Sequence, residues 1–179
     1  MDNTFAHSYT CEELIEVPNT ATPRIYFPGA SREGGHDGLT VEVHPAVGQA
    51  WIGTFAWGSV SPRGLSGVFT TPDIDRLCVV SRGDGYFVSA SDPQAWTRVQ
   101  ATPVMDARLI PAKGLIVFAD FTRLWAYGRG GLVWKREIGW DSLQITDVTE
   151  AIIKGEYWDA PRGVMADFAV DLETGSSRQ

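Results

Sequence analysis

Residues Leu115–Ile138 read LIVFADFTRLWAYGRGGLVWKREI, and this stretch decides the fold. An apolar run is followed by a polar turn, a second apolar run, the turn Gly128–Gly131 and a third run that contains Trp134. Within LWAYGRGGLVWKRE, the short runs and the Gly-rich turn between them are typical of antiparallel strands joined by tight connections. The stretch therefore predicts consecutive β-strands in a meander.

The same pattern extends along most of the chain, and it predicts an all-β fold. Nineteen glycines and ten prolines separate short apolar runs, many of which alternate apolar and polar residues with a period of two. Asp141–Ile153 also favours a strand, because its β-branched residues fit a helix poorly. Only Thr10–Pro18, with a capping threonine and early acids, predicts a single helical turn. The other expected strands are PRIYFPG, GLTVEVHP, QAWIGTFAWG, LSGVFTT, RLCVVS, GYFVSAS, EAIIKGEYWD and MADFAVDLETG.

An internal repeat is suggested when residues 77–100 are set over residues 115–138 without a gap. The offset is 38 residues, the distance from Trp96 to Trp134, and it also matches leucine, valine and arginine pairs. Each copy has a strand, a turn, a second strand and a tryptophan that begins or joins a third strand. We expect Trp96 and Trp134 to be equivalent structural residues, both largely buried between stacked sheets.

LIVFADFTRLWAYGRGGLVWKRE resembles a blade of the quinoprotein-like or WD-type β-propeller repeats, and FAVDLETG, Phe168–Gly175, is similar to the strand and turn that precede the blade tryptophan. The resemblance covers about residues 77–175. It implies antiparallel meander repeats in a small or partial propeller, with an open two-sheet β-sandwich as the alternative. It implies no quinone, because the metal ligands that hold such cofactors are not found in this sequence.

The domain organisation expected from these features is one all-β domain, residues 1–179. Residues 1–20 are expected to be an irregular N-terminal segment, and residues 77–175 form the repeat region. The apolar segment Val164–Leu172 is expected to pair with Pro23–Gly29 and so close a ring, or else to be buried in a homodimer.

Composition and charge exclude several classes of protein. Hydrophobic residues make up 44% of the chain and charged residues 21%, which is unlike disordered proteins. The net charge of −7 disfavours a nucleic-acid partner. No secretory signal or membrane-spanning apolar stretch is apparent, so we expect a cytoplasmic protein without a membrane partner, with Cys11 and Cys78 as free thiols.

The sequence predicts no catalytic residues, no metal and no cofactor. His36, Asp37 and His44 lack a recognised ligand spacing. The serines at 59, 61 and 66 lack the strand-turn-helix context of a nucleophile elbow, and the Gly-rich turns lead into strands rather than helices. A non-enzymatic role is therefore favoured.

The candidate binding residues cluster near the C-terminus: Trp140, Glu156, Tyr157, Trp158 and Asp159. Strand alternation requires Tyr157 and Trp158 to point to opposite faces. We expect a contact surface for a protein partner, in particular a basic one, as in immunity or antitoxin-like proteins. The alternative is a carbohydrate-binding module or glycan-acting enzyme that uses Glu156–Asp159.

Overall fold

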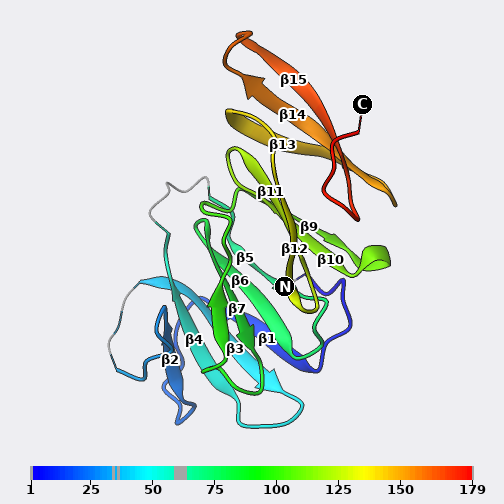
Figure 1. Cartoon of the computed structure of the whole chain (residues 1–179). Coiled ribbons are helices and arrows are strands. Elements are labelled where there is room, and N and C mark those ends of the chain that lie inside the picture. The colour runs from blue at the N-terminus through cyan, green and yellow to red at the C-terminus, as the bar shows by residue number, and fades with distance from the viewer. Residues whose placement is uncertain (1, 34, 36, 59–63, 179) are drawn as a thin grey trace.

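The computed structural model describes residues 2–33, 35, 37–58 and 64–178. Within these residues, the strands form four sheets that follow one another in chain order along the molecule (Figure 1). The first sheet contains β1 (Tyr9–Leu14), β2 (Arg24–Phe27), β3 (Gly38–Pro45) and β4 (Trp51–Ala56), and the second contains β5 (Gly67–Thr70), β6 (Arg76–Ser81), β7 (Asp84–Ser89) and β8 (Trp96–Arg98). The third contains β9 (Asp106–Ile110), β10 (Leu115–Ala119), β11 (Arg123–Gly128) and β12 (Gly131–Glu137), and the terminal sheet contains β13 (Asp141–Val148), β14 (Ile152–Asp159) and β15 (Val164–Asp171).

The second and third sheets are four-stranded antiparallel meanders, with the strand orders β5-β6-β7-β8 and β9-β10-β11-β12. The terminal sheet continues the pattern with three strands, and the first sheet differs because β2 runs parallel to β4. The fold is thus all-β with propeller-like blades, as predicted. It contains a series of sheets rather than the two sheets of a β-sandwich.

Three apolar clusters fill the spaces between successive sheets. The first contains Phe27 and Phe55, whose rings stack with centroids 4.6 Å apart, and the second contains Phe87 and Phe118. The third joins the third and terminal sheets. Sheets buried on both faces need continuous apolar strands, and this explains why RLCVVS and LIVFA lack alternation.

The 38-residue repeat register is wrong by one residue. Leu77 pairs with Val88 in the second sheet, and the matching pair in the third sheet is Ile116 with Tyr127. Ile116 comes 39 residues after Leu77, and Tyr127 comes 39 residues after Val88. Leu77 faces the first sheet, whereas Leu115 faces the terminal sheet. A shift of one residue moves every side chain of a strand to the other face.

Trp96 and Trp134 are consequently not equivalent. Trp96 is partly buried against Phe27 and Tyr86, on the side of the first sheet. Trp134 is 8% exposed and lies in the cluster on the side of the terminal sheet. The two indoles therefore fill different gaps and point in opposite directions along the stack.

Two expectations about the N-terminal part are corrected. Thr10–Pro18 forms no helical turn, because Tyr9–Leu14 is β1 and pairs with β3, and its presence means that residues 1–20 are not simply irregular. Tyr9 and Cys11 alternate into the first cluster, so burial in the sheet prevails over the local capping signal.

The expected pairing of the C-terminal strand with Pro23–Gly29 is also wrong. β15 pairs with β14, and β2 pairs with β4. The first and terminal sheets lie at opposite ends of the molecule (Figure 1). Each sheet is satisfied by its sequence neighbours, and the described residues form an open stack instead of a ring.

Candidate functional site

The terminal sheet has one covered face and one open face. The covered face packs against the third sheet through four buried side chains: Leu143, Ile145, Ile153 and Val170. Because side chains alternate along a strand, the residues between these positions point away from the stack. We call the result the acidic outer face, and it contains Asp141, Asp147, Lys154, Glu156, Trp158, Met165 and Asp167.

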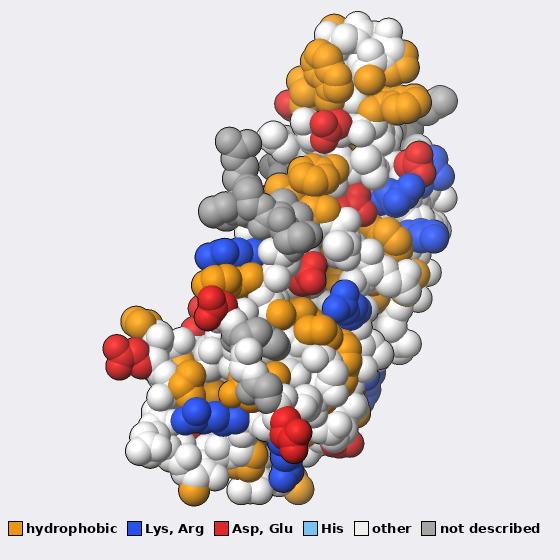
Figure 2. All heavy atoms as spheres, turned by 90° about the vertical axis from the view of Figure 1, so that its left-hand side faces the viewer, with side chains coloured by type: hydrophobic (Ala, Val, Ile, Leu, Met, Phe, Trp, Pro, Cys, Tyr) orange, Lys and Arg blue, Asp and Glu red, His pale blue; other side chains and the backbone are white. Residues whose placement is uncertain are grey.

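An apolar pair lies on the acidic outer face. Trp158 on β14 is directly opposite Met165 on β15, and the two side chains are 39% and 44% exposed. Figure 2 shows hydrophobic side chains gathered at the end of the molecule that β13–β15 form in Figure 1, with acidic side chains beside them. Exposed aromatic and methionine side chains are the residue types that protein interfaces favour.

Two acidic residues face each other next to this pair. Glu156 lies directly opposite Asp167, and Gln144 is the neighbour of Glu156 on β13. Among the ion pairs of the described residues, neither Glu156 nor Asp167 takes part. Like charges directly opposite in a sheet destabilise it. Asp141 and Asp147 add two further acids, Lys154 adds one base, and Asp171 on β15 is balanced by its ion pair with Arg178, so this face has an excess of negative charge.

The structure separates the other predicted site residues from this face. Tyr157 packs on the covered side against Gly139, where an added Cβ would lie 2.0 Å from the tyrosine ring. Asp159 accepts a hydrogen bond from the backbone N–H of Arg162 and forms an ion pair with its guanidinium. Trp140 precedes β13, is 67% exposed and lines a hollow together with Thr122 and Arg123 of the third sheet region. Glu156 and Trp158 therefore share a face that Tyr157 and Asp159 do not.

Asp167 and Met165 complete the face but were missed from sequence. The signal was present, since VMADFAVDL places both at alternate positions of one apolar strand. What the sequence alone could not supply is the register, which sets Asp167 opposite Glu156 and Met165 opposite Trp158.

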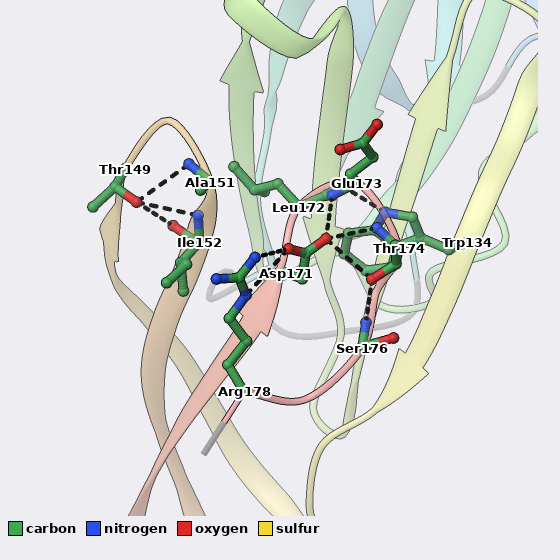
Figure 3. Close-up of polar contacts among 10 residues, drawn as sticks. All are labelled: Trp134, Thr149, Ala151, Ile152, Asp171, Leu172, Glu173, Thr174, Ser176 and Arg178. Carbon is green, nitrogen blue, oxygen red and sulfur yellow. Dashed lines mark hydrogen bonds and ion pairs between the residues drawn. The ribbon is translucent and has the colours of Figure 1, made fainter.

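The C-terminal turn fixes the end of β15 (Figure 3). The Trp134 indole N–H donates to the carbonyl oxygen of Leu172 at 2.8 Å, and Gly175 lies against the same ring with φ +70°. The Asp171 carboxylate accepts hydrogen bonds from the backbone of Thr174 and pairs with Arg178. The Arg178 guanidinium, together with these hydrogen bonds, lowers the pKa of Asp171 to about 2.

The opposite end of the stack has an acidic surface as well. Glu12 on β1 lies directly opposite Glu42 on β3, on the face that points away from the first cluster. The His44 imidazole is 3.5 Å from the Glu42 carboxylate. Both ends of the molecule thus present facing pairs of acidic side chains.

Candidate metal ligands and thiols occur in the part of the chain that the structure describes. No three His, Cys, Asp or Glu side chains come together there as a metal site, and His36, Ser59 and Ser61 lie outside the described residues. Burial raises the pKa of the Cys11 thiol to about 11 and also raises the pKa of Cys78, so both remain protonated. No helix among the described residues is long and apolar enough to span a membrane.

Comparisons with known proteins show similarity at the level of structure. No protein-family model and no curated protein sequence matches the chain. The chain is similar to dihydro-heme d1 dehydrogenase NirN in complex with DHE, with 14% identity, a TM-score of 0.48, and coverage of 82% of this chain and 36% of that one. It is also similar to the N-terminal domain of Nup159, with 12% identity, a TM-score of 0.48, and coverage of 97% and 50%.

A third similar structure is the S. cerevisiae complex of Dbp5 with Nup159 and Gle1, with 11% identity, a TM-score of 0.46, and coverage of 97% of this chain and 49% of the matched one. The chain therefore spans half or less of the length of these β-propeller proteins. The blade architecture rests on the sheet order and register of the chain itself, and no comparison assigns it to the quinoprotein-like or WD-type families.

Proposed function

We propose that this chain is a protein-binding domain and that its acidic outer face binds a basic protein. The observation that carries the proposal is the facing pair of Glu156 and Asp167 next to the exposed Trp158 and Met165. The acidic pair is an unfavourable arrangement of charges. The apolar pair beside it consists of side chains of the kind found at the centre of interfaces.

A cationic partner explains why such a pair is tolerated. Two like charges directly opposite on a sheet cost up to about 1 kcal/mol. A lysine or arginine of the partner, placed between Glu156 and Asp167, converts this repulsion into two attractive contacts. Trp158 supplies the large, partly exposed ring that dominates the affinity of many interfaces.

The charges favour a different protein over a second copy of this chain. A contact between two copies through their end faces brings the Glu156–Asp167 pair against itself or against the Glu12–Glu42 pair. Juxtaposed like charges oppose association. An immunity or antitoxin-like role, in which an acidic protein neutralises a basic toxin, fits this chemistry and the chain's net charge of −7.

The position of the predicted aromatic and acidic residues weakens the carbohydrate-binding alternative. A sugar subsite needs carboxylates and aromatic rings that converge on one cavity. The terminal sheet instead places Glu156 and Trp158 on its open face, while Tyr157 lies on the covered face against Gly139. A subsite made of all four consecutive residues 156–159 does not form.

The proposal is tested by affinity capture from the source cells with three baits. The first is the native protein, the second combines Glu156→Gln with Asp167→Asn, and the third is the control with Glu12→Gln and Glu42→Gln, which loses two charges from the other end. We expect a protein rich in lysine and arginine to bind the native bait and the control, but not the second bait. Binding should weaken as salt concentration rises.

The purified partner is then mapped by amide hydrogen exchange on the native protein. Protection is expected over β14 and β15, and Trp158→Ala should weaken binding by more than about 1 kcal/mol. Equal capture by all three baits contradicts the proposal. So does binding to a glycan array that is lost on Trp158→Ala, since that result supports the carbohydrate alternative.

A further inference from the structure

A cavity of about 270 Å³ lies between the second and third sheets, next to the turn that joins β11 to β12. Its apolar wall comes from Phe87, Ile116 and Tyr127, which are all at most 6% exposed. The rings of Phe87 and Tyr127 meet at a tilt, with centroids 5.0 Å apart. The third and terminal sheets lie between the cavity and the acidic outer face, so the cavity is independent of the proposed protein-binding function.

The charge of the cavity is opposite to that of the molecule. The lining of the cavity contains three arginines, Arg76, Arg98 and Arg129, and one acidic residue, Asp73. The chain as a whole has a net charge of −7. None of these arginines takes part in an ion pair of the described residues. Arg98 lies opposite Tyr86, so its side chain starts from the other face of the sheet, and we take Arg76 and Arg129 as the principal cations of the cavity.

Two hydroxyl groups add polar contacts beside the apolar wall. Thr97 lies directly opposite Phe87 and shares its face. The Tyr127 hydroxyl oxygen accepts a hydrogen bond from the backbone N–H of Gln100 at 2.9 Å, and its own proton is not used in that bond. Burial raises the pKa of Tyr127, so this hydroxyl stays protonated and able to donate.

The Gly-rich turn keeps the rim of the cavity open. Gly131 has φ +112°, a conformation that favours glycine, and an added Cβ at Gly130 or Gly131 would meet nothing within 4 Å. Arg129 lies between glycines in this turn. The Arg129 guanidinium lies at this rim, where its planar set of donors can bind an anion.

We propose that this cavity binds a small organic anion with a single flat ring. The ring lies against Phe87 and Tyr127, and a carboxylate or phosphate on the ring binds Arg76 and Arg129. Planar guanidinium groups recognise both kinds of anionic group through paired hydrogen bonds. The size of the cavity is just below the range of common ligand pockets and suits a ligand of this size.

The test is a titration of the full chain followed by amide NMR, with benzoate, phenyl phosphate, inorganic phosphate and benzyl alcohol as probes. We expect saturable shifts at Phe87, Tyr127 and Gly128–Gly131 with benzoate or phenyl phosphate. The ring anions should bind at least about tenfold more tightly than inorganic phosphate or benzyl alcohol. Comparison of benzoate with phenyl phosphate identifies the preferred anionic group.

A double variant, Arg76→Gln with Arg129→Gln, should lose at least about tenfold in affinity for the ring anion. The matched control, Arg32→Gln with Lys113→Gln, removes the same charge from exposed positions and should bind like the native protein. The proposal is overturned if the ring anions cause no saturable shifts at millimolar concentration. It is also overturned if inorganic phosphate binds equally well, or if the two folded double variants bind alike.

Discussion

Trp134 joins three parts of the molecule through one side chain. Its ring belongs to the cluster under the terminal sheet, contacts Gly175, and donates a hydrogen bond to Leu172. We expect Trp134→Ala to lower the free energy of unfolding by about 3–5 kcal/mol, because it leaves a large cavity and an unpaired carbonyl. Denaturant unfolding followed by circular dichroism measures the change.

Trp140 provides the control for this substitution, since it is 67% exposed. Trp140→Ala should change the free energy of unfolding by less than about 0.5 kcal/mol. Equal losses for the two variants would contradict the assigned role of Trp134.

The Asp171 carboxylate gives a prediction on pH. Arg178 and the backbone of the C-terminal turn hold its pKa in the folded state at about 2, below the ordinary value of 3.8. Its contribution to stability is therefore fully present above the ordinary value and is lost as the pH falls towards 2. An NMR titration of the carboxyl carbon should show the low midpoint, and Arg178→Gln should raise it. A midpoint at the ordinary value in the native protein would disprove the contact.

At the scale of single residues, the sequence shows which side chains are important but not where they point. Trp96 and Trp134 align by type, and the pairing registers differ from that alignment by one residue. A shift of one residue moves each side chain to the opposite face of the sheet. Because both faces of an inner sheet are buried and apolar, an alignment of similar residues cannot show which face a side chain occupies. The pairing of Glu156 with Asp167 is hidden for the same reason.

Among the elements, β15 is the one whose removal is most informative. Val170 and Leu172 are 1% and 0% exposed and anchor the terminal sheet. A chain that ends at Asp167 lacks both of these buried side chains, and each contributes about 2–5 kcal/mol. Its free energy of unfolding should therefore fall by at least about 4 kcal/mol. A chain that ends at Leu172 keeps both residues and should lose much less. Thermal unfolding of the two monomers measures the difference, and full stability of the shorter chain would refute the prediction.

Most strands could be predicted from alternation and turn residues, and the exceptions have a physical explanation. β1 carries CEEL, whose charges imitate the start of a helix, although Tyr9 and Cys11 are turned into the core. β9 was missed because DARLI is short and polar. It is stabilised by pairing with the next strand, β10, and the partner of a strand is not visible in that strand's own residues.

The whole molecule carries acidic pairs at both ends, and this predicts its association behaviour. We expect the isolated protein to sediment as a monomer at neutral pH and low salt, because contact between end faces is repulsive. Analytical ultracentrifugation tests this expectation. A stable dimer at low salt that dissociates in Glu156→Gln, Asp167→Asn protein would contradict it.

At the same scale, the stacking of the sheets explains how much of the candidate sites could be foreseen. Glu156 and Trp158 were identified because they lie close together in the sequence. The cavity brings Arg76, Phe87 and Arg129 together from two sheets, so its parts are separated by dozens of residues. A local sequence pattern cannot predict a site that forms only when two sheets pack against each other.

The serial order of the sheets also determines how the molecule comes apart. Each inner sheet is held by two neighbours, while the first and terminal sheets are held by one. Chains built in this way behave like a one-dimensional array, in which the ends fray before the middle. Amide protons of β6 and β10 should thus exchange only on global unfolding, and those of β14 through partial opening. The surface proposed to bind a partner belongs to such an end, so a partner that binds there would also act as a clamp on the least cooperative part of the fold.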